Sequence, residues 1–163
     1  MYRNLSLHLI IIVPDGRMLL TRNVYDDTFS DNISPWRVSF RRYTGDVKNK
    51  CMAEKEIKEK FKLKVYNVLH TDLGVIPEMD KQFEITYLFP LNDDDPYTQD
   101  IEVYKVRIDS MIHMCPKSEF MELRCFTYYD VLNMALDEGK QKIEATSVDI
   151  LNIYDSLIQN HDN

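Results

Sequence analysis

Hydrophobic residues fall into short runs and alternations that predict a sheet interrupted by helices. The run Leu5–Val13 is rich in Leu, Ile and Val and predicts a mostly buried strand. Pro14–Gly16 then favours a tight turn, because proline presets φ and glycine accepts a positive φ. The loop-like stretch Asn23–Pro35 is polar. Further strands are predicted over Arg17–Arg22, Trp36–Phe40, Glu84–Leu91, Ile101–Ile108 and Glu122–Thr127.

Three segments have the spacing of helices with one apolar face. In Asn49–Phe61 the apolar residues fall near one face and Lys and Glu occupy the rest. Tyr129–Leu136 and Ser147–Ile158 are predicted as two closing helices. Val65–Ile76 contains β-branched residues without a helical stripe, so it is predicted to be extended.

The order of these elements predicts an α+β fold, with a mixed sheet and helices packed against it. The elements do not alternate regularly enough for a doubly wound sheet. No linker divides the chain, so we expect one domain over residues 1–163, with the last few residues frayed.

Composition narrows the classes of function. The 163 residues include 20 Lys and Arg against 27 Asp and Glu, which gives a net charge of −7. An acidic total argues against non-specific nucleic-acid binding, which needs a basic face. Cys51, Cys115 and Cys125 have neither disulfide nor zinc spacing, and no apolar run approaches the length of a membrane span. These features predict a cytoplasmic protein.

Glu56 and Glu59 are the first candidates for chemistry. They lie three residues apart in the predicted helix and therefore share one face. Two carboxylates on a rigid helix can contribute oxygen ligands to Mg²⁺ or Mn²⁺. Spacing alone also fits an ordinary solvated face of a Lys-rich helix, which is the commoner case.

The surrounding sequence favours the first interpretation. Together, and in order, the segments resemble the Nudix superfamily, with its box G-x5-E-x7-R-E-U-x-E-E-x-G-U (U is a bulky aliphatic). The segments that carry the resemblance are Leu7–Leu9, Asp15–Arg22, Trp36–Ser39, Lys55–Leu63, Glu84–Phe89, Glu122–Phe126, Tyr129–Leu132 and Ala145–Ser147. The resemblance implies a Nudix-like α/β/α sandwich and a metal site for a diphosphate substrate.

The box itself is degenerate. With Lys55 at the Arg position, the matches are Glu56, Ile57, Glu59 and Leu63, whereas Lys60 replaces the second Glu and Lys62 the Gly. The first Gly of the box falls at Arg41, and Asp46 lies close to the place of the early Glu. A lysine in a cation site should weaken metal binding. A non-glycine residue at the helix end should cost about 1 kcal/mol or change how the helix ends.

Three hypotheses follow. The first is a Nudix-type hydrolase of a nucleoside diphosphate-linked or other diphosphate-containing metabolite, with Glu56 and Glu59 catalytic and Glu56, Glu59 and Asp46 holding Mg²⁺ or Mn²⁺. The second is a non-catalytic Nudix-fold module that binds a nucleotide or diphosphate. The third is a module that binds a protein partner. Substrate contacts are predicted at Trp36, Arg37, Arg41 and Arg42, and a homodimer is a further prediction.

Overall fold

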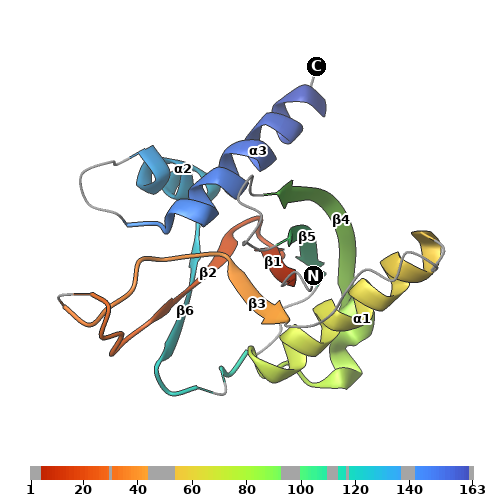
Figure 1. Cartoon of the computed structure of the whole chain (residues 1–163), viewed down its shortest axis with the longest axis horizontal. Coiled ribbons are helices and arrows are strands. Elements are labelled where there is room, and N and C mark those ends of the chain that lie inside the picture. Colours follow the sequence, from red (N-terminus) through yellow and green to blue (C-terminus); the bar gives the residue numbers. More distant parts are fainter. Residues whose placement is uncertain are drawn as a thin grey trace.

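The structure is a computed structural model that describes residues 5–29, 31–43, 54–92, 100–109, 114–116, 118–136 and 142–161, with 5, 43, 54–61, 92, 100, 160 and 161 described only by their backbone. Its centre is a six-stranded mixed sheet in the order β4-β5-β1-β2-β6, with β3 also paired to β1 (Figure 1). The strands are β1 Leu5–Ile12, β2 Met18–Asn23, β3 Ser39–Tyr43, β4 Phe83–Asn92, β5 Asp100–Ile108 and β6 Met121–Phe126.

Strand β1 is central because it pairs along both edges. It is parallel to β5 and antiparallel to β3 and β2. Its first half pairs with β3, from Leu5 opposite Tyr43 to Leu9 opposite Ser39. Its end pairs with β2, where Ile12 lies opposite Met18. Burial on both faces explains why β1 is an almost continuous hydrophobic run.

Two helical layers cover the sheet, as Figure 1 shows. Helix α1 (Glu54–Thr71) covers one face, and α2 (Tyr128–Leu136) and α3 (Ala145–His161) cover the other. Alternate residues of β1 separate the two cores: Leu7 and Leu9 pack on the α1 side, and Ile10 packs on the α3 side. The predicted α+β sandwich with a mixed sheet is therefore confirmed.

The largest error of the sequence-based prediction concerns α1. The predicted extended segment Val65–Ile76 is wrong over its first half, because α1 continues without interruption to Thr71. Val65, Val68 and Leu69 are fully buried at helical spacing. Their burial against the sheet outweighs the weak preference of β-branched residues for strands. The short 3-10 helix η1 (Pro77–Gln82) occupies part of the polar stretch before β4.

Smaller differences concern the ends of elements. Trp36 and Arg37 form isolated bridges, and β3 itself begins at Ser39 rather than Trp36. Helix α3 reaches His161, beyond the predicted end at Ile158 and into the tail that was expected to fray. The other predicted strands and both closing helices are confirmed to within a few residues. Residues 49–53, the predicted beginning of the first helix, lie outside the described residues.

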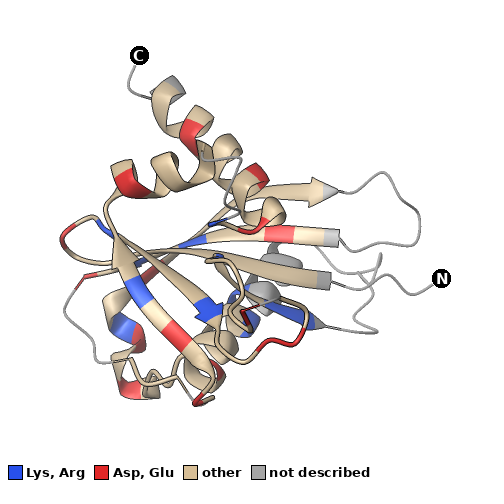
Figure 2. Ribbon diagram, turned by 90° about the vertical axis from the view of Figure 1, so that its left-hand side faces the viewer, with Lys and Arg blue, Asp and Glu red and all other residues tan. Residues whose placement is uncertain are grey.

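Charged positions are spread over the fold. Figure 2 shows acidic and basic positions interspersed over the sheet and the helices. Among the described residues, no helix is both long enough and apolar enough to cross a membrane. Any concentration of charge is therefore local, and one such place lies at β3.

Candidate functional site

Two predicted substrate contacts, Arg37 and Arg42, converge on a single aromatic ring. The guanidinium carbon of Arg37 lies 4.7 Å from the centroid of Phe40, and that of Arg42 lies 5.8 Å from it. His8 stacks on Phe40, with centroids 5.1 Å apart and ring planes 11° apart. We call Arg37, Arg42, Phe40 and His8 the arginine cluster. Cation–π contacts of this kind hold guanidinium groups in place while leaving their N–H donors available.

Strand pairing explains why these residues meet. His8 lies opposite Phe40, and Ser6 lies opposite Arg42. The side chains of these two pairs therefore belong to the same face of the β1–β3 pair. This is also the face of Ile10, which packs on the α3 side. The alternation in two short strands thus places the cluster next to the beginning of α3.

His8 supplies a neutral ring rather than a charge. It is 4% exposed, and burial, helped by Arg42 and Arg37, lowers its pKa to about 4. Its Nε2 lies 2.9 Å from Ser6 Oγ. Its buried Nδ1 has no hydrogen-bond partner within the described part of the chain. A buried polar atom without a partner is costly, so it often marks a place where a ligand or water binds.

Acidic residues compensate the cluster only in part. Glu144 lies at the beginning of α3, with its Oε2 4.0 Å from Arg37 Nη1. Burial raises the pKa of Glu144, against the opposite effect of Arg37 and Arg42. Burial also lowers the pKa of Arg37, although Glu144 and Asp26 oppose that change. Arg42 forms no ion pair with another described residue. The cluster therefore favours an added anion.

A pocket of about 410 Å³ adjoins the cluster. We call it the Trp36 pocket; it is lined by Arg22, Phe29, Asp31, Ile33, Ser34, Pro35, Trp36, Met134 and Lys142. Backbone bonds join its wall to the cluster: Trp36 N–H donates to Lys142 O, and Glu144 N–H donates to Trp36 O. Since Trp36 precedes Arg37 and Lys142 lies two residues from Glu144, the pocket and the cluster are neighbours.

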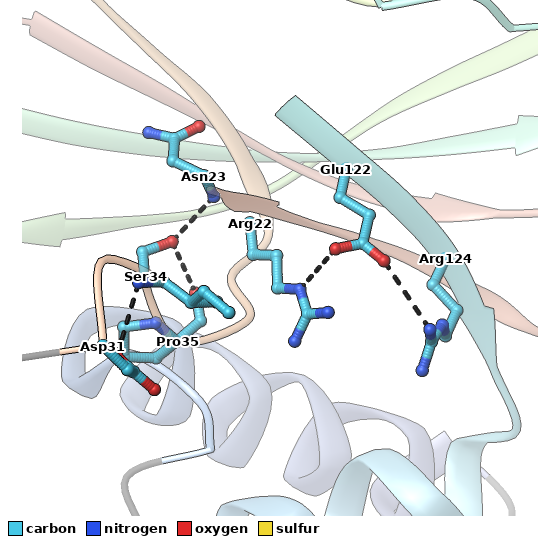
Figure 3. A network of polar contacts seen from close by, with 8 residues as sticks. Arg22, Asn23, Asp31, Ser34, Pro35, Glu122 and Arg124 are labelled. Atoms are coloured by element: carbon cyan, nitrogen blue, oxygen red, sulfur yellow. Dashed lines mark hydrogen bonds and ion pairs between the residues drawn. The ribbon is translucent and has the colours of Figure 1, made fainter. Parts of the chain in front are cut away.

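The rim of the Trp36 pocket is held by polar contacts that Figure 3 shows. Ser34 Oγ accepts a hydrogen bond from the backbone N–H of Asn23 at 2.8 Å. Asp31 Oδ1 accepts one from the N–H of Ile33 at 3.3 Å, which closes a turn around Asn32 at φ 61°. Asparagine tolerates this left-handed conformation better than most residues. The loop is thus shaped by its own short polar side chains.

Two arginines, Arg22 and Arg124, lie over the Trp36 ring and share one acidic partner, Glu122. Figure 3 shows the ion pairs that Glu122 forms with both. Arg22 Nε lies 2.7 Å from Glu122 Oε2, and Arg124 Nη2 lies 3.6 Å from Glu122 Oε1. The hydrogen bond from Arg22 lowers the pKa of Glu122. The guanidinium carbons of Arg22 and Arg124 lie 4.3 Å and 5.4 Å from the Trp36 ring centroid. These cations are neutralised in part by Glu122, unlike Arg42.

The side chain of Trp36 is mostly buried in the core rather than exposed in the pocket. It is 7% exposed and meets Phe126 edge to face, with centroids 5.1 Å apart. Its ring belongs to the hydrophobic core on the α3 side. The structure thus brings Trp36 to the pocket wall, and its predicted contact with a substrate stays a prediction.

Arg41 is separated from the other predicted contacts. Adjacent residues of a strand point to opposite faces, so Arg41 lies on the α1 side, opposite Leu7. Its Nη1 is 3.8 Å from Asp72 Oδ1, just after α1 ends. The predicted group of Arg37, Arg41 and Arg42 is thus divided by the sheet.

The predicted acidic site is largely beyond what the structure describes. Asp46 lies outside the described residues, as do the side chains of Glu56 and Glu59, whose backbone belongs to α1. Among the described residues, no group of three His, Cys, Asp or Glu side chains is placed to hold a metal ion. The roles predicted for these three acids stay predictions.

The fold resembles solved structures of one superfamily. The NUDIX domain of Shewanella oneidensis NrtR, solved in complex with ADP ribose, superposes with a TM-score of 0.57 at 10% identity, covering 96% of this chain and 88% of that one. The MutT protein of Methanosarcina mazei Go1 gives 0.56 at 13% identity, covering 93% and 92%. An ADP compounds hydrolase gives 0.52 at 14% identity, covering 97% and 74%.

This chain has the Nudix fold. The likeness extends over nearly its whole length, as the resemblance in sequence led us to expect. No family model matches the sequence, and no curated protein matches it either. The fold is therefore recognised through structure, whereas function depends on the residues of the site.

Sequence reasoning missed three members of the site. His8, Phe40 and Glu144 are not among the contacts predicted from the sequence. The sequence holds a signal for two of them. His8 lies two positions from the polar Ser6, and Phe40 lies two positions from the basic Arg42, so each pair would share one face of a strand. Only the pairing of β1 with β3, which the sequence does not specify, places them together.

Proposed function

We propose that this Nudix-fold protein binds a nucleotide-like metabolite that carries a diphosphate. The observation that carries the proposal is the convergence of Arg37 and Arg42 over Phe40, beside the neutral ring of His8. Guanidinium groups suit phosphate oxygens because their N–H donors form a planar fork. An anion there would also offset the burial that lowers the pKa of Arg37.

The Trp36 pocket supplies room for the uncharged part of such a ligand. Its volume, about 410 Å³, falls within the usual range for small-molecule sites. Its lining combines the apolar Ile33, Met134 and Phe29 with the cations Arg22 and Lys142. We place the diphosphate at the arginine cluster and a base or sugar in the pocket. ADP-ribose is a suitable probe because the structurally similar NUDIX domain of NrtR was solved with it.

Hydrolysis of the diphosphate is the second candidate, favoured by the fold and by Glu56 and Glu59 sharing one turn of α1. In this version Glu56, Glu59 and Asp46 hold Mg²⁺ or Mn²⁺, which would neutralise the phosphates and activate water. We rank hydrolysis second because α1 is one continuous helix, which separates Glu59 from the residue that lies beside β3. That residue is Asp72, and Glu59 precedes it by more than three turns, about 20 Å along the helix axis.

Calorimetry with ADP-ribose and ADP, combined with a measurement of AMP and phosphate release, separates the two candidates. We expect ADP-ribose to bind without turnover, with or without Mg²⁺ or Mn²⁺. Metal-dependent release that the Glu59→Gln variant abolishes would establish the hydrolase instead. Absence of both binding and turnover with the whole panel would contradict both candidates and leave the protein-binding hypothesis.

A further inference from the structure

The end of α1 is built around a glycine at which an added Cβ would clash with the backbone. Gly74 has φ 67°, and a Cβ on it would lie 2.0 Å from the backbone oxygen of Cys115. Leu73 and Val75 on either side are 1% and 2% exposed, and Leu69 is fully buried. The chain therefore leaves the helix through a fixed, left-handed turn that anchors it against the core.

This end fits the pattern R-E-U-x-E-E-x-G-U when it is placed on Asn67–Val75. Its glycine then falls on Gly74 and its bulky aliphatic positions fall on Leu69 and Val75. The alternative placement on Lys55–Leu63 puts the glycine position at Lys62, inside a continuous helix. It also puts the last aliphatic position at Leu63, which is 69% exposed. Backbone conformation and burial both favour the placement on Asn67–Val75.

The residues at the acidic positions of this placement do not suit a divalent cation. They are Val68, which is fully buried, Thr71 and Asp72. The Thr71 hydroxyl donates to Asn67 Oδ1 at 3.1 Å, and Asp72 faces the guanidinium of Arg41 at 3.8 Å. Mg²⁺ requires near-octahedral oxygen coordination and usually one or two carboxylates beside substrate oxygens. Here a single carboxylate is shared with a fixed cation.

Another acid on the same face of the sheet, Glu102, is already engaged. Glu102 lies opposite Leu7 on β5, as Arg41 does on β3, and it is 5% exposed. Its hydrogen bond with the Tyr87 hydroxyl, together with burial, raises the pKa of Tyr87. Asp72 and Glu102 are thus each engaged by another side chain, and the described residues contain no group of three His, Cys, Asp or Glu side chains that could hold a metal ion.

We infer that the Arg41 guanidinium takes the place of a metal ion at the end of α1, that Asp72 therefore holds no divalent cation, and that the ligand, placed across the sheet at the arginine cluster, binds without one. The part of this inference that concerns the ligand rests on the function proposed above, whereas the part that concerns the metal does not depend on it. Arg41 lies on the face of β3 that points to the α1 side, and its guanidinium meets Asp72, the one acid at the positions just discussed. A permanent cation therefore neutralises Asp72 from within the protein.

Mn²⁺ titration followed by the electron paramagnetic resonance signal of free Mn²⁺ tests the metal part directly. We expect the wild type and the Asp72→Asn variant to bind the same amount of Mn²⁺, because Asp72 holds none. Asp109→Asn, which removes another acid that faces an arginine on the surface, is the matched control for a change of net charge. A site present in the wild type and in Asp109→Asn, but lost in Asp72→Asn, would overturn the inference.

Calorimetry with ADP-ribose tests the ligand part, once in EDTA and once in Mg²⁺. We expect the two dissociation constants to agree within about twofold, because the cations proposed to meet the phosphates are Arg37 and Arg42, whose charge does not depend on Mg²⁺. Binding that appears only with Mg²⁺ would overturn the inference while leaving the proposed function standing. No binding in either buffer would contradict the proposed function, and the Mn²⁺ result would still decide the metal part.

Discussion

Arg41 and Arg42 are neighbours in sequence, yet the sheet gives them opposite surroundings. Arg41 lies on the α1 side against Asp72, where its charge is met by a carboxylate of the same chain. Arg42 lies on the α3 side over Phe40, exposed and without an ion pair to another described residue. Equal charges thus have different uses, since one completes the fold and the other is available to a ligand.

The two sides also differ in what surrounds the cations. On the α1 side, burial of Leu69, Leu73 and Val75 fixes the helix end, and Gly74 sets its direction. On the α3 side, a neutral buried histidine and an aromatic ring form the floor of the arginine cluster. We therefore expect changes on the α1 side to affect stability first and changes at the arginine cluster to affect ligand binding.

Shortening Leu69 should give the largest effect. Leu69→Ala removes a fully buried side chain between α1 and the sheet, and should lower the free energy of unfolding by about 2–5 kcal/mol. Leu63→Ala is the matched control, because Leu63 is 69% exposed and its loss should cost less than about 0.5 kcal/mol. Urea denaturation measures both. Equal costs for the two variants would mean that the helix is rotated relative to the sheet.

His8 should make stability depend on pH. Its pKa is about 4 in the folded protein and 6.5 in an ordinary environment, so the unfolded chain binds more protons between these values. The stability it contributes is complete above pH 6.5 and is lost as the pH falls towards 4, to a total of about 3 kcal/mol. Denaturation at pH 7 and at pH 4.5 should show a smaller loss in His8→Gln than in the wild type. An identical loss of stability in the two proteins would show that folding does not lower the pKa of His8.

Gly74→Ala tests the turn after α1. The added Cβ meets the Cys115 oxygen at 2.0 Å and forces an alanine into a positive φ, so we expect a loss of about 2 kcal/mol or more. Gly16→Ala has a similar φ, 88°, but nothing within 4 Å of the new Cβ, and should cost about 1 kcal/mol. Thermal or urea unfolding compares the two. A smaller loss for Gly74→Ala than for Gly16→Ala would contradict the packing described here.

Arg42→Met should weaken ADP-ribose binding with little change in stability. Removing a charge-assisted contact at an exposed site should raise the dissociation constant about tenfold. Arg107→Met is the matched control, because Arg107 is an exposed arginine near Asp109 on another strand. Calorimetry of both variants measures the effect. Equal weakening in the two variants would show that only net charge matters, and would remove the arginine cluster from the account.

The sequence predicts the layers of the fold better than it predicts the site. Hydrophobic runs and turn residues are local signals, so Leu5–Val13 and the turn at Gly16 are identified correctly. The segment after Phe61 was misjudged because Val65 and Val68 suit both a strand and a buried helix, and only their contact with the sheet decides. The position of the box along this segment, on Lys55–Leu63 as predicted from the sequence or on Asn67–Val75 as inferred above, depends on the same contacts.

The arginine cluster could be predicted only in part. Arg37 and Arg42 were each predicted to contact the substrate, which stays a prediction, and the structure brings them together over Phe40. The separation of Arg41 follows from strand alternation, but only once the strand is known to reach Tyr43. The contributions of His8 and Glu144 depend on contacts between distant segments, at β1 with β3 and at the beginning of α3, which the sequence alone does not show.

A crystal structure of the protein grown with ADP-ribose and Mg²⁺ tests the central claim most directly. The account predicts phosphate oxygens within about 3 Å of the guanidinium groups of Arg37 and Arg42, with Asp72 still facing Arg41. A Mg²⁺ ion bound to Asp72, or bridging the diphosphate to Glu56 and Glu59 away from the arginine cluster, would contradict it.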